Sequence, residues 1–192
     1  MRKLILIYIF IGSSSMLWSQ TTLPQLQALQ YSTTSFGNAL NFNGTNTYGI
    51  GQVYVQDSIT DFTIEFWVKN TGVDDNNDRI YSSYNNNALQ IGKSATELKL
   101  LSTDLGGSAS WQTPCTLESN TWVHLAIVKN ATALTVYKNA TAIASYTVTA
   151  AATLPTMFRL GSSVDGIGEN GNFTMDELRI WNAVRTKADI QK

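Results

Sequence analysis

Acidic side chains are the first candidates for chemistry, because two carboxylates held about 5 to 9.5 Å apart can hydrolyse a glycosidic bond. Side chains two positions apart share one face of a β-strand, whereas adjacent side chains point to opposite faces. Glu65 is the only carboxylate in the alternating segment 62–69, and Asp176 and Glu177 are adjacent. The sequence therefore predicts no catalytic carboxylate pair, and a protein that is not an enzyme.

The single histidine is the second candidate, because a Ser-His-Asp mechanism would need it as the general base. His124 lies within the strongly apolar segment 122–128. An apolar strand buries its side chains, so this position favours a structural histidine rather than a catalytic one.

One segment imitates a calcium-binding loop. Asp74, Asn76 and Asp78 have the spacing of its first three ligands. Such a loop needs Gly at its sixth position and Glu at its twelfth, where this sequence has Arg79 and Asn85. The segment therefore predicts a solvated hairpin.

Aromatic residues beside amides and carboxylates are candidates for sugar binding, since ring faces pack on sugar C–H groups while polar side chains bond the hydroxyls. Trp111 ends the small-residue segment 106–111, which predicts an exposed loop. Trp67 and Tyr81 are further candidates for an aromatic platform, although each of these aromatic residues can instead belong to the core. The predicted ligand-binding residues are Trp111, Tyr84, Asn86, Asp165 and Asn170.

These residues must be positioned by β-strands. Residues 43–46 predict a turn, and residues 186–191 predict a short helix with Thr186 as its cap. No helix separates any two strands, which excludes a parallel α/β sheet because its crossovers need a dozen or more residues. Eleven segments have the alternating or continuously apolar pattern typical of strands, and they cover residues 39–42, 48–50, 62–69, 79–84, 88–91, 97–101, 122–128, 134–137, 143–148, 158–161 and 173–181.

The predicted fold class is all-β, a two-sheet antiparallel β-sandwich of the jelly-roll kind with one short C-terminal helix. An immunoglobulin-like sandwich fits less well, because the chain is long and lacks the cysteine pair. Each sheet must bury one face, and the aromatic residues predicted to fill the core are Phe42, Phe62, Phe66, Trp122, Phe158, Phe173 and Trp181.

Four segments together resemble one family. Residues 39–48, 62–69, 122–129 and 175–182 resemble, in order and spacing, the laminin G-like jelly-roll domains of secreted bacterial proteins. Those domains belong to the concanavalin A-like lectin and glucanase superfamily, and residues 183–190 resemble their short final helix. The resemblance covers about residues 35–191 and implies one domain at 36–192. It implies little about function, because the same sandwich hosts sugar binding, protein adhesion and hydrolysis.

The resemblance also implies a structural calcium ion, which would be the one cofactor. Carried over from the family, its ligands would be Asp176 and the carbonyl of Gly44. Asn43 stands where the family commonly has Asp, which removes a negative charge from the turn. The alternative is that Asp176 accepts backbone N–H bonds. The Glu-x-Asp-x-x-Glu strand motif of the related laminarinase-type hydrolases is absent.

The N-terminus predicts a secretory signal. Met1, Arg2 and Lys3 provide a positive start, and the apolar residues 4–11 are too few to span a bilayer. We expect cleavage after Ser19, so that residues 1–19 form the signal peptide and residues 20–35 form a linker or an edge strand. The alternative is a buried N-terminal strand or helix.

Composition limits the partners. The chain has 13 Lys and Arg residues against 14 Asp and Glu, a formal net charge of −1, which excludes the clustered positive charge of a nucleic-acid binder. The lone Cys115 excludes an internal disulfide and a cysteine-type zinc site. No later segment is long enough for a transmembrane helix.

The sequence predicts a secreted, non-enzymatic recognition or adhesion module, located outside the cell or on its surface. The expected partner is a glycan or a cell-surface protein, with carbohydrate binding favoured. The alternative is a structural or spacer domain of a cell-surface assembly that binds no small ligand.

Overall fold

The computed structural model describes residues 7–13, 32–34, 37–53, 58–72, 78–83, 89–102, 107, 110–163 and 168–190. The elements are β1 (Ile7–Ser13), β2 (Ser32–Thr34), β3 (Gly37–Asn43), β4 (Thr47–Val53), β5 (Phe62–Asn70), β6 (Asp78–Ser83), β7 (Gln90–Lys93), β8 (Glu97–Leu101), β9 (Gln112–Thr116), β10 (Trp122–Asn130), β11 (Ala133–Lys138), β12 (Thr141–Thr147), β13 (Met157–Leu160), β14 (Asn172–Trp181) and α1 (Lys187–Ile190).

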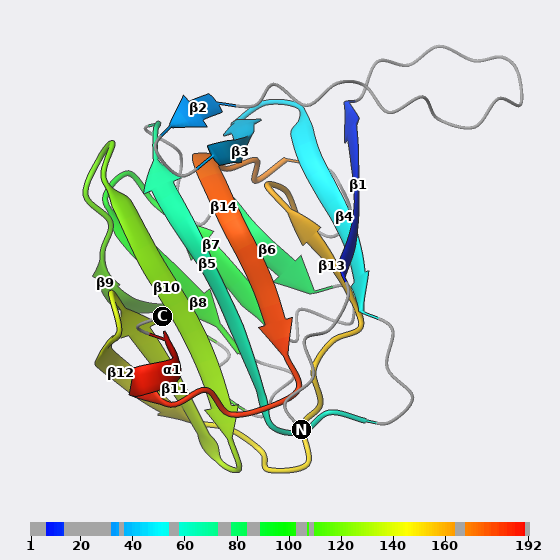
Figure 1. Ribbon diagram of the computed structural model, residues 1–192, viewed down its shortest axis with the longest axis vertical. Coiled ribbons are helices and arrows are strands. Elements are labelled where there is room, and N and C mark those ends of the chain that lie inside the picture. The colour runs from blue at the N-terminus through cyan, green and yellow to red at the C-terminus, as the bar shows by residue number, and fades with distance from the viewer. Residues whose placement is uncertain are drawn as a thin grey trace, which may run out of the picture.

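The described strands form two antiparallel sheets that pack face to face (Figure 1). Sheet A has the strand order β12-β11-β10-β5-β14-β3-β2. Sheet B has the order β1-β4-β13-β6-β7-β8-β9. The short helix α1 lies in front of sheet A, at the end of β10 and β11 (Figure 1). The predicted β-sandwich jelly roll is therefore confirmed.

All eleven predicted strands are present, as β3 to β8 and β10 to β14. Sequence patterns missed β9, which contains Pro114. Proline cannot donate to a strand ladder, and it is tolerated here because β9 is the edge strand of sheet B. The helix is also present, and the Thr186 hydroxyl accepts a hydrogen bond from the backbone N–H of Asp189 at 3.3 Å, as expected of a cap.

Residues 7–13 of the N-terminal segment form the strand β1. β1 pairs with β4 along its whole length, from Ile7 opposite Val53 to Ser13 opposite Thr47. β2 pairs with β3 and forms an edge strand of sheet A. It lies within residues 20–35, the segment expected to be a linker or an edge strand. Removal of residues 1–19 would leave β4 as the edge of sheet B, and cleavage after Ser19 remains a prediction.

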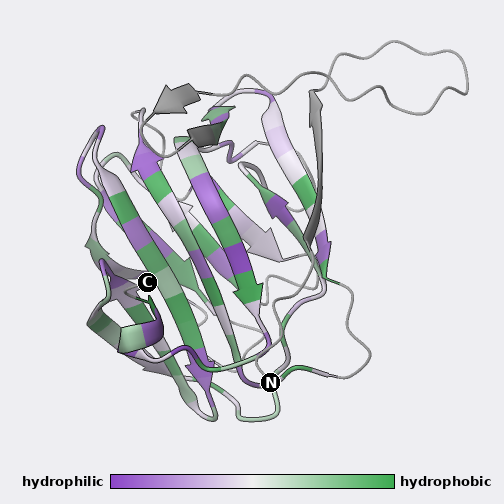
Figure 2. Cartoon of the chain, in the orientation of Figure 1, coloured by the Kyte–Doolittle hydropathy of each residue, from purple (hydrophilic) through white to green (hydrophobic). Residues whose placement is uncertain are grey.

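The core lies between the sheets and is built from alternate residues of each strand. In β5, Ile64, Phe66 and Val68 are at most 1% exposed and face sheet B. Figure 2 shows hydrophobic and hydrophilic residues alternating along β10 and β14. The five phenylalanines predicted for the core are confirmed, namely Phe42, Phe62, Phe66, Phe158 and Phe173.

The prediction that Trp122 and Trp181 lie in the core is wrong. Trp122 pairs with Lys69 and Trp181 pairs with Thr63, residues on the face of β5 that points away from sheet B. Both tryptophans are half-buried on this outer face of sheet A. The outer face of β10 is covered along its second half, where Ala126 and Val128 pack under Ile190 of α1.

Among the described residues, none of the helices has the length and apolar character needed to cross a membrane.

Candidate ligand-binding site

A pocket of about 310 Å³ opens on the outer face of sheet A. Three neighbouring strands supply most of its lining, with Trp67 on β5, His124 on β10, and Glu177 and Arg179 on β14. One wall is formed by the β11–β12 turn and α1. The lining residues are Trp67, His124, Asn139, Ala140, Glu177, Arg179 and Ile190.

The aromatic side of the pocket is set by strand register. His124 lies directly opposite Trp67, and their ring centroids are 5.2 Å apart at a tilt of 57°. The β11–β12 turn fixes Asn139 beside this pair, because its side-chain oxygen accepts the His124 backbone N–H at 2.9 Å. Asn139 has a positive φ of 49°, a conformation that asparagine tolerates better than most residues.

A bulge in β14 brings the charged side chains to the pocket. Asp176 lies opposite Trp67 and Arg179 opposite Glu65, so three steps along β14 match two steps along β5. The extra residue is Glu177, which has a φ of +50°. A bulge re-aims the side chains that follow it, so Glu177 and Arg179 both line the pocket. The expectation that adjacent Asp176 and Glu177 serve opposite faces does not hold here, because it assumed a regular strand.

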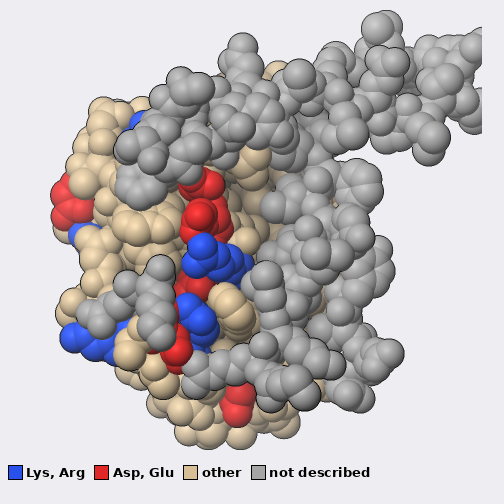
Figure 3. All heavy atoms as spheres, viewed as in Figure 1, with Lys and Arg blue, Asp and Glu red and all other residues tan. Residues whose placement is uncertain are grey.

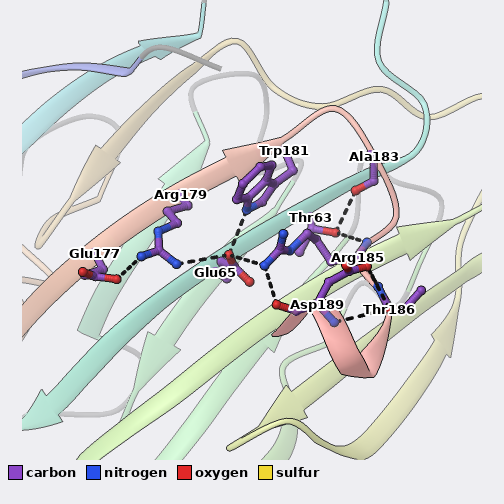
Figure 4. Close-up of polar contacts among 9 residues, drawn as sticks. All are labelled: Thr63, Glu65, Glu177, Arg179, Trp181, Ala183, Arg185, Thr186 and Asp189. Carbon is purple, nitrogen blue, oxygen red and sulfur yellow. Dashed lines mark hydrogen bonds and ion pairs between the residues drawn. The ribbon is translucent and has the colours of Figure 1, made fainter. Parts of the chain in front are cut away.

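The charged groups form a column on this face, as Figure 3 shows in red and blue along β14 and toward α1. Glu65 lies beneath it with 1% of its surface exposed. Its Oε1 accepts the indole N–H of Trp181 at 2.8 Å and lies 3.8 Å from Arg179 Nη1 and 3.7 Å from Arg185 Nη2 (Figure 4). Arg179 also forms an ion pair with Glu177. Glu65 thereby holds the guanidinium of Arg179 at the edge of the pocket.

Contacts of Arg185 with Glu65 and its neighbours fix the position of the C-terminal segment. Arg185 stacks over the Trp181 ring at 4.3 Å, and its backbone N–H donates to Thr63 Oγ1 at 3.0 Å. Thr186 and Asp189 cap α1 reciprocally, with Thr186 Oγ1 donating to Asp189 Oδ2 at 2.8 Å (Figure 4). These contacts seat Ile190 on Ala126, Val128 and Ala140, where it closes one side of the pocket.

His124 is neutral in this setting. Burial lowers its pKa below the usual value, and the positive charges of Arg179 and Arg185 lower it further, while Glu65 and Glu177 act in the opposite direction. The pocket therefore presents an uncharged imidazole beside one ion pair, formed by Glu177 and Arg179.

The lowered pKa of His124 makes stability depend on pH. The unfolded chain takes up a proton at about pH 6.5, whereas the folded chain does so only at lower pH, so the folded state loses stability as the pH falls below about 6.5. We expect the free energy of unfolding to be lower at pH 5.5 than at pH 7.5, and His124→Gln to remove most of this difference. Denaturant titration of both proteins at the two pH values measures it. No other histidine exists in the sequence, so an equal loss in both proteins would show that His124 is not responsible.

Of the five ligand-binding residues predicted from sequence, two can be placed. Trp111 is half-buried, with the guanidinium of Arg79 4.6 Å from its ring centre. Asn170 forms a bridge with Arg79 and donates its side-chain N–H to the Thr45 carbonyl at 2.9 Å. Both therefore lie around Arg79, away from the pocket. Tyr84, Asn86 and Asp165 lie outside the described residues.

The aromatic platform candidates also separate. Trp67 lines the pocket, whereas Tyr81 is fully buried and stacks on Phe158 with ring centroids 5.0 Å apart. The sequence carries no signal that makes Arg179, Glu177 and Asn139 partners of Trp67. Their meeting depends on the bulge and on a turn, which strand periodicity does not reveal.

The two expected calcium ligands do not meet. Asn172 lies opposite Asn43, the residue that precedes Gly44. Asp176 lies four residues beyond Asn172 on β14, so Asp176 and Gly44 are separated by roughly 13 Å along the strands. Calcium needs its ligands within about 2.3–2.6 Å, so one ion cannot bind both. Asp176 Oδ1 instead accepts the backbone N–H of Glu177 at 2.8 Å, which is the alternative stated above.

Hydrogen bonds to the Asn43 side chain stabilise the turn at Gly44. Asn43 Oδ1 accepts the backbone N–H groups of Thr45 and Asn46, both at 3.0 Å, and the Thr47 hydroxyl at 3.0 Å. Of the Asp74-Asn76-Asp78 segment, only Asp78 is among the described residues, where it begins β6. Among all the residues that the structure describes, no three His, Cys, Asp or Glu side chains lie close enough together to hold a metal ion.

Comparison with known families identifies the fold. Residues 40–191 match the family described as the concanavalin A-like lectin/glucanases superfamily. The chain belongs to this superfamily. Among curated proteins, none matches the chain closely enough to be called a relative.

Solved structures of the superfamily fold show the same sandwich. Domain 4 of AbnA, a GH43 extracellular arabinanase from Geobacillus stearothermophilus in complex with arabinotriose, is 19% identical with a TM-score of 0.64, covering 99% of this chain and 97% of that one. The binding domain of Paraclostridial Mosquitocidal Protein 1 is 17% identical with a TM-score of 0.66, covering 85% of this chain and 44% of that one. Trypanosoma rangeli sialidase in complex with 2,3-difluorosialic acid is 16% identical with a TM-score of 0.64, covering 84% of this chain and 27% of that one. At these identities the similarity establishes the fold alone.

Proposed function

We propose that this protein is a secreted, non-enzymatic recognition module that binds carbohydrate in the pocket of sheet A. The observation that carries this proposal is the placement of Trp67 in one pocket with Glu177 and Arg179. An indole face packs on sugar C–H groups, a guanidinium donates to hydroxyl oxygens, and a carboxylate accepts hydroxyl protons. The volume of about 310 Å³ is at the lower end of the range for ligand pockets, about 300–1,000 Å³.

The charges of the pocket favour a neutral sugar. Glu177 and Arg179 have opposite charges and form an ion pair, and His124 is uncharged at neutral pH because its pKa is lowered. An acidic sugar would therefore meet the Glu177 carboxylate without an excess of positive charge. Domain 4 of AbnA, which matches this chain over nearly its full length, was solved with a neutral oligosaccharide, arabinotriose, and this supports the same ligand class.

The carboxylates of sheet A support binding rather than hydrolysis. Glycoside hydrolysis needs two carboxyl groups that reach the same bond, one of them as a proton donor. Glu177 is engaged by Arg179, and Glu65 is buried under Trp181 and the two arginines. Asp176 Oδ2 is inaccessible to solvent. Secretion is supported by the N-terminal signal pattern.

The test is glycan-array binding by the wild type, Trp67→Ala and Trp111→Ala, with each variant checked for folding by circular dichroism. The array should hold neutral arabinan, galactan, xylan and β-glucan fragments together with sialylated glycans. We expect binding to neutral fragments, at least a tenfold loss of affinity for Trp67→Ala, about 1.4 kcal/mol, and no change for Trp111→Ala. Glu177→Gln serves as a second variant of the pocket because Glu177 is exposed and its replacement should not disturb folding.

Three results would change the proposal. Loss of binding in Trp111→Ala but not in Trp67→Ala would place the site at Trp111, one of the ligand-binding residues predicted from the sequence. Absence of binding to every glycan by the folded wild type would favour the spacer domain. Release of reducing sugar from any of the polysaccharides would show an enzyme.

A further inference from the structure

Sheet A carries a second tryptophan next to the pocket. Trp122 is two residues before His124 on β10 and lies opposite Lys69, just as His124 lies opposite Trp67. Side chains two apart share a face, so all four are on the outer face of sheet A. Trp67 and Trp122 are diagonal cross-strand neighbours, about 7–8 Å apart between Cα atoms, which is within reach of two large aromatic side chains.

The surroundings of Trp122 suit a polar ligand with apolar faces. Its side chain is half-buried, so part of the indole remains exposed to solvent. The ammonium group of Lys69 lies 5.3 Å from the centre of the ring. An aromatic surface beside a hydrogen-bond donor repeats the combination of Trp67 and Arg179 within the pocket.

The opposite end of the pocket is closed. Beyond His124, the next outward residues of β10 are Ala126 and Val128, and both are covered by Ile190 of α1. Ala140 and Ile190 form this wall of the pocket. A ligand longer than the pocket therefore extends along β10 in the other direction, over Trp122.

We infer that the site continues from the pocket to Trp122 and takes a chain of at least two linked neutral sugar units, with Trp67 holding one unit and Trp122 the next. This inference rests on the proposed function and deepens it from sugar binding to recognition of chain length. Trp122 is then the residue that distinguishes an oligosaccharide from its monosaccharide.

Calorimetric titration with a length series tests this inference. The probes are fragments of one to four units from arabinan, galactan, xylan and β-glucan. For the fragments that bind, we expect affinity to rise about tenfold between one unit and two or three units. Trp122→Ala should reduce the affinity for three units to that of one unit and leave the affinity for one unit unchanged. Trp111→Ala is the matched control, with the same chemical change at a half-buried tryptophan outside sheet A, and should retain the full gain.

The outcomes separate the two proposals. Equal affinity of the wild type for one and three units, or an equal loss at all lengths in Trp122→Ala, would overturn the extension while leaving the pocket in place. No binding at any length would overturn both. If Trp122→Ala does not fold, Trp122→Phe replaces it. That variant keeps a smaller ring and should retain only part of the gain, and retention of the whole gain would count against the inference.

Discussion

Replacing Glu65 by alanine is expected to lower the free energy of unfolding by about 3–5 kcal/mol, the range typical when one partner of a buried ion pair is removed. The carboxylate is 1% exposed and is the common partner of the Trp181 indole N–H, Arg179 and Arg185. Its loss leaves the indole N–H without its acceptor. It also removes the buried negative charge beside Arg179 and Arg185, which keep Glu177 and the Asp189 carbonyl as partners. A stability of about 5–15 kcal/mol holds a typical domain, so the variant should be far less stable than the wild type.

Unfolding in guanidinium chloride measures this loss. If the dependence of the free energy of unfolding on denaturant concentration is unchanged, the loss is seen as a lower midpoint concentration. The matched control is Glu97→Ala, another strand glutamate that pairs with a lysine, Lys99, at 2.6 Å on the surface. Exposed pairs contribute little, so the control should unfold close to the wild type. Glu65→Gln keeps an acceptor for Trp181 and should lie between the two. If Glu65→Ala and Glu97→Ala unfold at the same midpoint, Glu65 does not stabilise this part of the fold.

Alternation of apolar residues was sufficient to predict the strands and the two-sheet architecture. In β5, every second residue from Phe62 to Val68 is buried between the sheets, as the pattern indicates. The pattern is ambiguous in β10, because both faces of this strand are apolar. Trp122 looks like a core residue in sequence, but Val123, Leu125 and Ile127 occupy the inner face.

The error at Trp181 has a different physical cause. Met175 and Ile180 both face the core although they are five residues apart, an odd number that regular alternation does not allow. The bulge at Glu177 inserts the extra residue and turns Trp181 outward. The same displacement aims Arg179 at the pocket. One local irregularity thus accounts for both a wrong core residue and a binding residue that the sequence did not reveal.

The pocket as a whole could not be predicted from the sequence, because its residues are brought together by strand pairing. Its residues come from β5, β10, β14, a turn and α1, segments far apart in the chain that meet only through strand pairing. Trp67 could be proposed as an aromatic platform from its type and position. Its polar partners depend on register, which is set by the packing of the complete sheet.

Replacing Lys129 by methionine is expected to lower the free energy of unfolding by about 3 kcal/mol, since each buried polar group left unsatisfied costs about 1–3 kcal/mol and water can reach some of them after the change. The lysine lies near the end of β10 and is fully buried. Its Nζ donates to the carbonyl oxygens of Thr60 at 2.7 Å and of Ala131 and Ala150, both at 3.0 Å. These carbonyls belong to three separate connections at one end of the sandwich, so a single ammonium group joins all three.

Methionine retains the length and apolar stem of lysine, so the variant removes the three hydrogen bonds with little change in packing volume. Burial lowers the pKa of Lys129, with Asp61 acting in the opposite direction, which indicates that desolvation opposes the charge and makes the three carbonyls necessary. Lys138→Met is the control, because Lys138 donates to the Thr116 carbonyl at 2.8 Å and to Glu118 in exposed positions, and it should cost no more than about 1 kcal/mol. Denaturant midpoints of the two variants give the comparison. If Lys129→Met is as stable as Lys138→Met, the three connections hold their positions without the ammonium group, and the burial of a charge there has no role in stability.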